Sequence, residues 1–241
     1  MKMKKGLLTM LALLSMGSVF AQDFSGPDAK VVTSRKGVLK VQLSSTTSYR
    51  DLQFDLALPS GITLVTESVS PETPDATNVK EAAAGHVIAY NPVGTEGNVV
   101  RFAVYDQTGG NAFTDGVLIE IPVQATDAFT ANAVANVTNV VTSDALAVSY
   151  AKDSFDISIL VNLLGDVNED GKVNVTDIMA VASRIKGVET TPFNEGAADY
   201  TNDEKVNVTD IMGIATIIKS GSAGAKAFVV EIPIENMLDP Q

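Results

Sequence analysis

One short acidic pattern occurs twice in this chain, and it constrains the fold more than any other feature. The two copies begin at Asp166 and Asp199, 33 residues apart, and each spans twelve residues. In both copies, oxygen-bearing side chains stand at positions 1, 3, 5, 9 and 12. A hard divalent cation takes about six to eight oxygen ligands, and alternate residues of a tight loop can point at one centre. The spacing therefore predicts two calcium loops, with a backbone carbonyl added at position 7.

Each loop is predicted to hold one calcium ion through six residues, and the lysine at position 7 contributes its main-chain carbonyl. In the first loop these residues are Asp166, Asn168, Asp170, Lys172, Asn174 and Asp177. In the second loop they are Asp199, Thr201, Asp203, Lys205, Asn207 and Asp210.

The second loop departs from the pattern at two positions. Thr201 stands at position 3, and Glu204 stands at position 6, where the first loop has Gly171. Position 6 makes a sharp turn that favours glycine, because a residue with a Cβ is strained in the left-handed region. The second site is therefore predicted to be the weaker one. A second loop that keeps its shape without metal is the alternative.

Both loops run into a helical pattern of apolar residues spaced i, i+3, i+4 and i+7, which predicts one apolar stripe per helix. Gly187 and Gly221 stand where helix C-caps are expected. Pro192 and Gly196 predict a loop for residues 188–198 between the repeats. The stripes are Ile178, Val181, Ala182 and Ile185, and Ile211, Ile214, Ala215 and Ile218.

The repeat GDVNEDGKVNVTDIMAVASRIKG resembles a type I dockerin repeat, and AADYTNDEKVNVTDIMGIATIIKSG resembles its partner. The resemblance implies two EF-hand-like loop-helix units related by a pseudo-two-fold axis, with Asp at position 12 and no entering helix. It also implies calcium-dependent binding to a cohesin module of another protein. In that family, loop positions 10 and 11 carry partner specificity, and here they are Val175, Thr176, Val208 and Thr209.

Residues 23–160 predict an all-β domain. Leu52, Phe54, Leu56 and Leu58 alternate with polar or small residues, which is typical of a half-buried strand. Turn signals separate several such runs, and no long helical pattern occurs, so a β-sandwich is predicted. The other strands are predicted around Val38–Leu43, Val100–Val104, Val117–Val123, Val134–Val140 and Phe155–Ile159.

The all-β part resembles cohesin-like domains at Tyr49–Ile62, Val99–Tyr105 and Gly116–Val123. The resemblance implies a jelly-roll sandwich related to some carbohydrate-binding modules, and a generic sandwich is the alternative. Joined to a C-terminal dockerin, it is similar to secreted proteins of Bacteroidetes type. The expected fold is therefore an all-β sandwich (a cohesin-like jelly roll) at residues 22–160, followed by a small α dockerin module at residues 161–221.

Both ends of the chain have distinct patterns. Residues 1–21 combine three early lysines, an apolar stretch and Val19-Phe-Ala21, which predicts a cleaved export signal. The short junction after Leu160 contains Leu163 and Leu164, which are expected to pack under the helices. Residues 222–241 are predicted to be a tail with one possible strand at 228–234, or a poorly ordered end.

The composition of the chain argues against several classes of function. A formal net charge of −12 without a basic stripe argues against nucleic acid and anionic membranes. The chain has no cysteine, and His86 is its one histidine, so thiol chemistry is excluded and histidine-based catalysis is disfavoured. The carboxylates of the all-β part match no glycosidase motif. These are Asp51, Asp55, Glu67, Asp106, Asp115 and Glu120.

The leading hypothesis is a secreted, calcium-binding, non-catalytic assembly protein. Its dockerin would dock onto a cohesin-bearing partner, in the setting of extracellular polysaccharide degradation. The alternative is a carbohydrate-binding module attached to a dockerin, for which Tyr49, Tyr90 and Tyr105 are the available aromatic platform. A glycoside hydrolase ranks below both.

Overall fold

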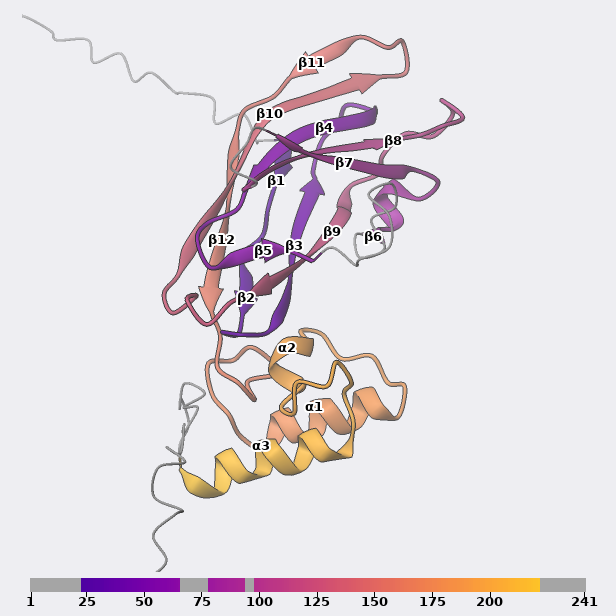
Figure 1. The fold of residues 1–241 in the computed structure, drawn as a ribbon. Helices are drawn as coiled ribbons and strands as arrows, with labels where there is room; N and C mark the ends of the chain where they lie inside the picture. Colours follow the sequence, from indigo (N-terminus) through magenta and orange to yellow (C-terminus); the bar gives the residue numbers. More distant parts are fainter. Residues whose placement is uncertain (1–22, 66–77, 94–97, 222–241) are drawn as a thin grey trace, which may run out of the picture.

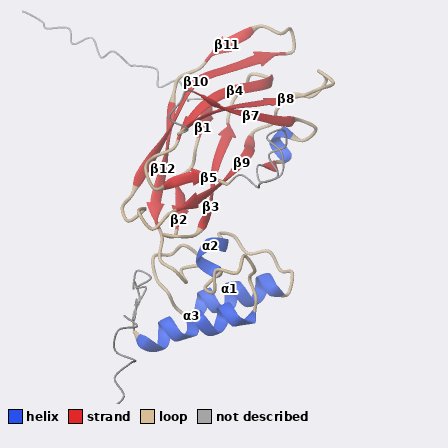
Figure 2. Ribbon diagram, in the orientation of Figure 1, coloured by secondary structure: helices blue, strands red, loops and turns tan. Residues whose placement is uncertain are grey.

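The computed structural model describes residues 23–65, 78–93 and 98–221. A β-sandwich built from the N-terminal part stands above a small helical module (Figure 1). Figure 2 shows that the strands and the long helices separate into these two parts. The predicted export signal and the possible strand at 228–234 lie outside the described residues.

The smaller sheet of the sandwich has the strand order β1-β3-β9-β5, with β6 also paired to β9. All of its described pairings are antiparallel. Its strands are β1 (Phe24–Ser25), β3 (Lys36–Leu43), β5 (Ile62–Leu64), β6 (Asn78–Val79) and β9 (Gly116–Ala125).

The larger sheet has the order β2-β12-β10-β4-β8-β7, with β11 also paired to β10. β2 and β12 run parallel, and the other described pairs are antiparallel. A short 3₁₀ helix, η1 (Glu81–Ala83), precedes β7. The strands are β2 (Ala29–Val31), β4 (Tyr49–Ala57), β7 (Val87–Val93), β8 (Val99–Tyr105), β10 (Ala133–Asp144), β11 (Ser149–Ala151) and β12 (Phe155–Val161).

The two sheets enclose one apolar core, as the alternation in the sequence predicts. Leu52, Phe54 and Leu56 of β4 are buried, and the Phe54 ring stacks on Phe102 with centroids 5.3 Å apart. The two-sheet sandwich is therefore confirmed. Sequence reasoning did not find β1, β2, β5, β6, β7 and β11, because most are only two or three residues long and β7 contains Pro92.

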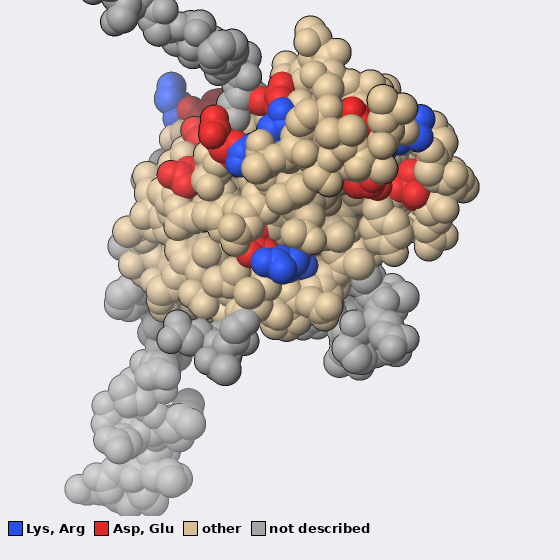
Figure 3. Space-filling view, turned by 90° about the horizontal axis from the view of Figure 1, so that it is seen from above, with Lys and Arg blue, Asp and Glu red and all other residues tan. Residues whose placement is uncertain are grey.

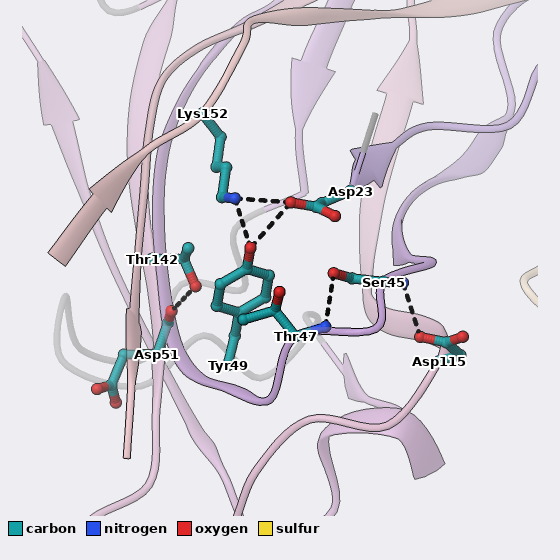
Figure 4. Close-up of polar contacts among 8 residues, drawn as sticks. All are labelled: Asp23, Ser45, Thr47, Tyr49, Asp51, Asp115, Thr142 and Lys152. Carbon is teal, nitrogen blue, oxygen red and sulfur yellow. Dashed lines mark hydrogen bonds and ion pairs between the residues drawn. The ribbon is translucent and has the colours of Figure 1, made fainter. Parts of the chain in front are cut away.

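Polar contacts close the core near the first described residues. Lys152 Nζ lies 2.6 Å from Asp23 Oδ2, and the Tyr49 hydroxyl donates to the same oxygen at 2.9 Å (Figure 4). Lys152 also contacts the Tyr49 hydroxyl and lies 4.6 Å from the centre of its ring. Because Tyr49 is buried in this cluster, it is not a carbohydrate platform as the alternative hypothesis allowed.

Charged side chains are spread over the end of the sandwich that lies opposite the helices. Figure 3 shows acidic and basic groups of this end interspersed, without a continuous basic patch on the face in view. No helix among the described residues has the length and apolar character needed to cross a membrane.

The helical module consists of α1 (Val175–Ile185), α2 (Glu195–Ala198) and α3 (Val208–Ser220). α1 and α3 pack on a small separate core that includes Val181, Ala198 and Ile214. Gly187 follows α1 with φ 76°, and Gly221 ends α3 with φ 64°, as predicted for the two helix ends.

Two expectations about this module need correction. Residues 188–198 are not all loop, because Asn194 caps a short helix by accepting the Ala197 N–H. The last members of the two apolar stripes, Ile185 and Ile218, are exposed because they extend beyond the small core. Leu163 packs against that core, as expected of the junction.

The buried carboxylate of Asp55, in β4 of the larger sheet, should make the stability of the fold depend on pH. Asp55 is buried and accepts two hydrogen bonds from Arg101, at 2.6 and 2.8 Å, and one from Asn139 at 2.8 Å. The Arg101 hydrogen bonds hold the pKa of Asp55 below its usual value, against the effect of burial. A lowered pKa stabilises the fold above about pH 4, and this contribution is lost as the pH falls through the folded pKa.

Asp55→Asn should therefore lower the free energy of unfolding at neutral pH by about 1 kcal/mol, since the guanidinium partner is solvent-exposed. The deficit should shrink in acid. Chemical denaturation across this pH range is the measurement, and Asp156→Asn, on the exposed side of the same sheet, is the control. A deficit that stays constant into acid would show that the Asp55 charge is not the cause.

Candidate calcium centre and partner-binding face

The carboxylate at position 1 of each loop binds the backbone of the turn that follows it. In the first loop, Asp166 accepts the N–H of Asp170 and of Gly171, both at 3.0 Å. In the second loop, Asp199 accepts the N–H of Asp203 at 3.2 Å and of Glu204 at 2.9 Å. The two repeats therefore share one backbone frame, in which N–H groups of positions 5 and 6 point at position 1.

The carboxylate at position 12 closes each loop from the other side. Asp177 accepts the N–H of Val167, Asn168 and Asn174 at 2.8–3.1 Å. Asp210 accepts the N–H of Thr201 at 3.0 Å and of Asn207 at 2.9 Å. Each aspartate thus ties the start of its loop to the start of its helix.

Positions 9 and 12 have a second role that sequence reasoning missed. Asn174 and Asp177 form a capping box at the start of α1, and Asn207 and Asp210 form the same box at α3. The sequence signal was available, because an Asn three residues before an acidic residue and an apolar run is typical of a helix start. Two of the six residues proposed as ligands in each loop therefore also begin the helix that follows.

Both loops turn through left-handed backbone at positions 4 and 6. At position 6, Gly171 has φ 83° and Glu204 has φ 63°, so the expected conformation is present in both loops. At position 4, Glu169 and Asn202 have φ 60° and φ 58°. Glu204 therefore adopts the strained geometry that glycine takes freely, which costs about 1–2 kcal/mol.

The donor set fits a hard cation such as calcium. It consists of carboxylate, amide, hydroxyl and carbonyl oxygens, and the carboxylates at positions 1 and 12 of both loops are buried. Burial raises the pKa of Asp166, and the nearby negative charges of Asp177 and Asp170 raise it further. A bound cation would neutralise this crowded charge.

The carboxylates are hydrogen-bonded to their own loops as described above. Within residues 23–65, 78–93 and 98–221, no three carboxylate, imidazole or thiol side chains form a cluster that is already arranged as a metal site. The donor chemistry and the repeated backbone frame are the features of these loops that favour calcium.

The proposed partner-binding residues lie in two pairs, one at the start of α1 and one at the start of α3. Val175 and Val208 are 61% and 60% exposed, and Thr176 and Thr209 are also exposed. One helical turn further on, Met179 and Met212 are 63% and 65% exposed. Sequence reasoning missed the methionines, although their i+4 spacing from the valines was a visible signal. Each helix thus presents the same small apolar face to solvent.

Other candidate groups have structural roles. His86 is buried, with each ring nitrogen 2.9 Å from a backbone carbonyl oxygen and with Phe113 stacked on its ring. Asp106 accepts backbone N–H groups of the turn after β8, which hold its pKa well below the usual range. Glu120 pairs with Lys40 and Lys80. Glu67 lies outside the described residues.

The comparisons with known proteins agree with the geometry of the helical module. Residues 164–218 match the family model of the dockerin type I domain. The chain therefore contains a dockerin type I domain. Such a domain implies a cohesin partner and generally binds calcium, and proteins that carry it are typically extracellular. No curated protein matches the chain.

Solved cohesin structures match the sandwich. One is the cohesin module of a family 33 glycoside hydrolase of Clostridium perfringens, at 10% identity and TM-score 0.45, covering 59% of this chain and 98% of that one. Another is the sixth cohesin of scaffoldin B of Acetivibrio cellulolyticus, solved in complex with a Cel5 dockerin mutant, at 11% identity and TM-score 0.44, covering 58% and 99%. A non-cellulosomal cohesin of Archaeoglobus fulgidus matches at 12% identity and TM-score 0.42, covering 57% and 91%. The Bacteroidetes type of protein stays a prediction.

Proposed function

We propose that this chain is a secreted, non-catalytic assembly protein whose dockerin domain binds a cohesin-bearing partner in a calcium-dependent manner. The observation that carries the proposal is the repeated unit of the helical module. In each repeat, a loop closed by two buried carboxylates leads directly into an exposed apolar helix start. The domain type and the predicted export signal support an extracellular setting, and polysaccharide degradation is the context that we propose for it.

Calcium would be held by the six residues of each loop, from Asp166 to Asp177 and from Asp199 to Asp210. The ion supplies positive charge between carboxylates that otherwise repel one another. The chain's own residues orient the helices, because the aspartates of position 12 join each loop to its helix through the capping boxes. Order in the loops therefore places the two apolar helix starts on the surface.

The same surface chemistry in both repeats supports two modes of partner binding. Val175 and Met179 on α1 are matched by Val208 and Met212 on α3, with nearly equal exposure. The residue pair at positions 10 and 11 is identical in the two loops. A partner could thus engage either helix start, in two orientations related by about 180° if the repeats follow a pseudo-two-fold axis.

Calcium should be required for full order of the helical module. Each loop carries three carboxylates at ligand positions, and the core beneath them is small. Far-UV circular dichroism of the full chain should show helix gain when calcium replaces EDTA. A variant with both Asp166→Ala and Asp199→Ala should show no such gain. Equal helix content of the unmodified chain in both conditions would contradict calcium-coupled folding.

Partner binding should survive the loss of one helix start and fail when both are lost. Val175→Asp with Thr176→Asp should leave binding to a cohesin partner nearly intact, while the same changes at Val208 and Thr209 in addition should abolish it. A pull-down from the culture medium of the source organism, with and without EDTA, identifies the partner, and calorimetry then measures its affinity. Val188→Asp, at an exposed valine outside the loops, is the control. Loss of binding after the first pair of changes would rule out two modes.

The two calcium sites should differ in affinity. The strain at Glu204 and the weaker donor Thr201 both disfavour the second loop, whereas the formal ligand charge is the same in both loops. Glu204→Gly removes about 1–2 kcal/mol of strain and loses an exposed ion pair with Lys36 worth at most about 1 kcal/mol. The net effect is a roughly fivefold tightening of the weaker site.

Calorimetric calcium titration of the full chain measures this difference. Asp166→Ala should remove the stronger site and leave the weaker one. Two sites of equal affinity in the unmodified chain, or no response to Glu204→Gly, would contradict the strain argument.

A further inference from the structure

The sandwich touches the first loop through β2 and the second loop through the connection between β2 and β3. In Figure 1 this connection lies at the lower end of the sandwich, next to α2 and the loops. Arg35, in this connection, donates from Nε to the carbonyl of Asp199 at 3.2 Å and from Nη2 to the carbonyl of Tyr200 at 3.1 Å. One guanidinium thus holds the backbone of positions 1 and 2 of the second loop.

The first loop is held through a buried amide and a lysine. Asn194 donates to the carbonyl of Lys30 at 2.8 Å and to the side chain of Glu169 at 2.9 Å. Its backbone N–H donates to the carbonyl of Val167 at 2.9 Å. The Lys30 ammonium donates to the carbonyl of Glu169, at position 4 of the first loop. Asn194 and Lys30 therefore join β2 to the first loop, while Arg35 joins the sandwich to the second.

The two parts approach each other as closely as their backbones allow. A Cβ at Gly196 of α2 would lie 2.3 Å from the carbonyl oxygen of Lys36 in β3, which is closer than real Cβ contacts come. The Lys36 ammonium is 3.0 Å from Glu204, the strained residue at position 6 of the second loop. Glycine at 196 is thus required by the contact with the sandwich.

These contacts leave the calcium ligands free. The sandwich binds carbonyls of positions 1, 2 and 4, whereas the ligand pattern uses the carbonyl of position 7. The apolar helix starts also stay exposed, because Val175, Met179, Val208 and Met212 are 60–65% exposed with the sandwich in place. The sandwich can therefore hold the loops without covering either the ligands or the partner-binding face.

We propose that β2 and its connection to β3 are a built-in support for the calcium loops, with Arg35 as the positioning residue of the second loop. The inference rests on the proposed calcium function. By fixing the backbone at positions 1 and 2, Arg35 lowers the conformational cost of forming a loop that lacks the usual glycine. Because coupling is reciprocal, calcium in the loops also stabilises the contact between sandwich and helical module.

Whether Arg35 substitutions raise or lower the calcium affinity distinguishes a positioning role of Arg35 from an effect of its charge alone. Arg35 is a cation near a cation site, so charge alone would make Arg35→Ala bind calcium more tightly. Loss of positioning would make it bind more weakly. Arg35→Lys keeps the charge but loses the planar fork that reaches two carbonyls at once. Weaker calcium binding in both variants is therefore the signature of positioning.

Calcium titration of the full chain by calorimetry, together with hydrogen exchange of residues 199–204 and 32–37, tests the proposal. Arg35→Ala should weaken the weaker calcium site by roughly five- to tenfold, with a smaller loss for Arg35→Lys. Gly196→Ala, which changes no charge and no ligand, should weaken the same site. In both Arg35→Ala and Gly196→Ala, calcium should no longer protect residues 32–37 from exchange as it does in the unmodified chain.

Two matched controls are available on the sandwich. Lys40→Ala also removes one positive charge from the sandwich, in β3, the strand that follows Arg35. Lys40 pairs with Glu120 and not with a loop residue. Gly110→Ala places a Cβ at an ordinary 3.5 Å from Thr108. Both should titrate like the unmodified chain. This inference alone is overturned if the unmodified chain binds calcium and the Arg35 and Gly196 variants bind it with the same affinity. It is also overturned if Arg35→Ala binds calcium more tightly. A chain that binds no calcium overturns the proposed function itself.

Discussion

The helical module depends on four buried carboxylates, two in each loop. Asp166 and Asp199 gather backbone N–H groups of their own turns, and Asp177 and Asp210 gather those of the loop start and the helix start. Buried carboxylates are costly unless they are paired or hydrogen-bonded. The hydrogen bonds offset part of that cost, and a cation would offset the like charge that remains. One set of side chains thus shapes the loops and begins the helices, and the same side chains would be ligands of a bound cation.

The module has two faces with different tasks. On one face, the loops and α2 meet the sandwich through Arg35, Asn194 and the close approach at Gly196. On the other, α1 and α3 leave matched pairs of valine and methionine exposed. These exposed pairs occupy equivalent positions in the two repeats.

The sandwich is a well-closed domain whose polar groups mainly serve its own structure. Asp55, Asp106 and His86 each have partners within the fold. Its two-sheet core rests on alternating residues that the sequence displays openly, such as Leu52, Phe54 and Leu56. Its contacts with the following domain come from β2 and from the connection between β2 and β3, which reach the two loops.

The sequence by itself determined the local features: the loop positions, the glycine at the end of α3, the main strands and the two-layer architecture. These follow from spacing and alternation, which act over a few residues. Only the tertiary structure decided the strand order, the burial of Tyr49, the exposure of Ile185 and Ile218, and the contacts of Arg35 and Asn194. Arg35 and Asp199 are far apart in the sequence, and no local pattern marks a guanidinium that will meet a backbone carbonyl. The same holds for Gly196, which reads as a turn residue until the carbonyl of Lys36 is seen beside it.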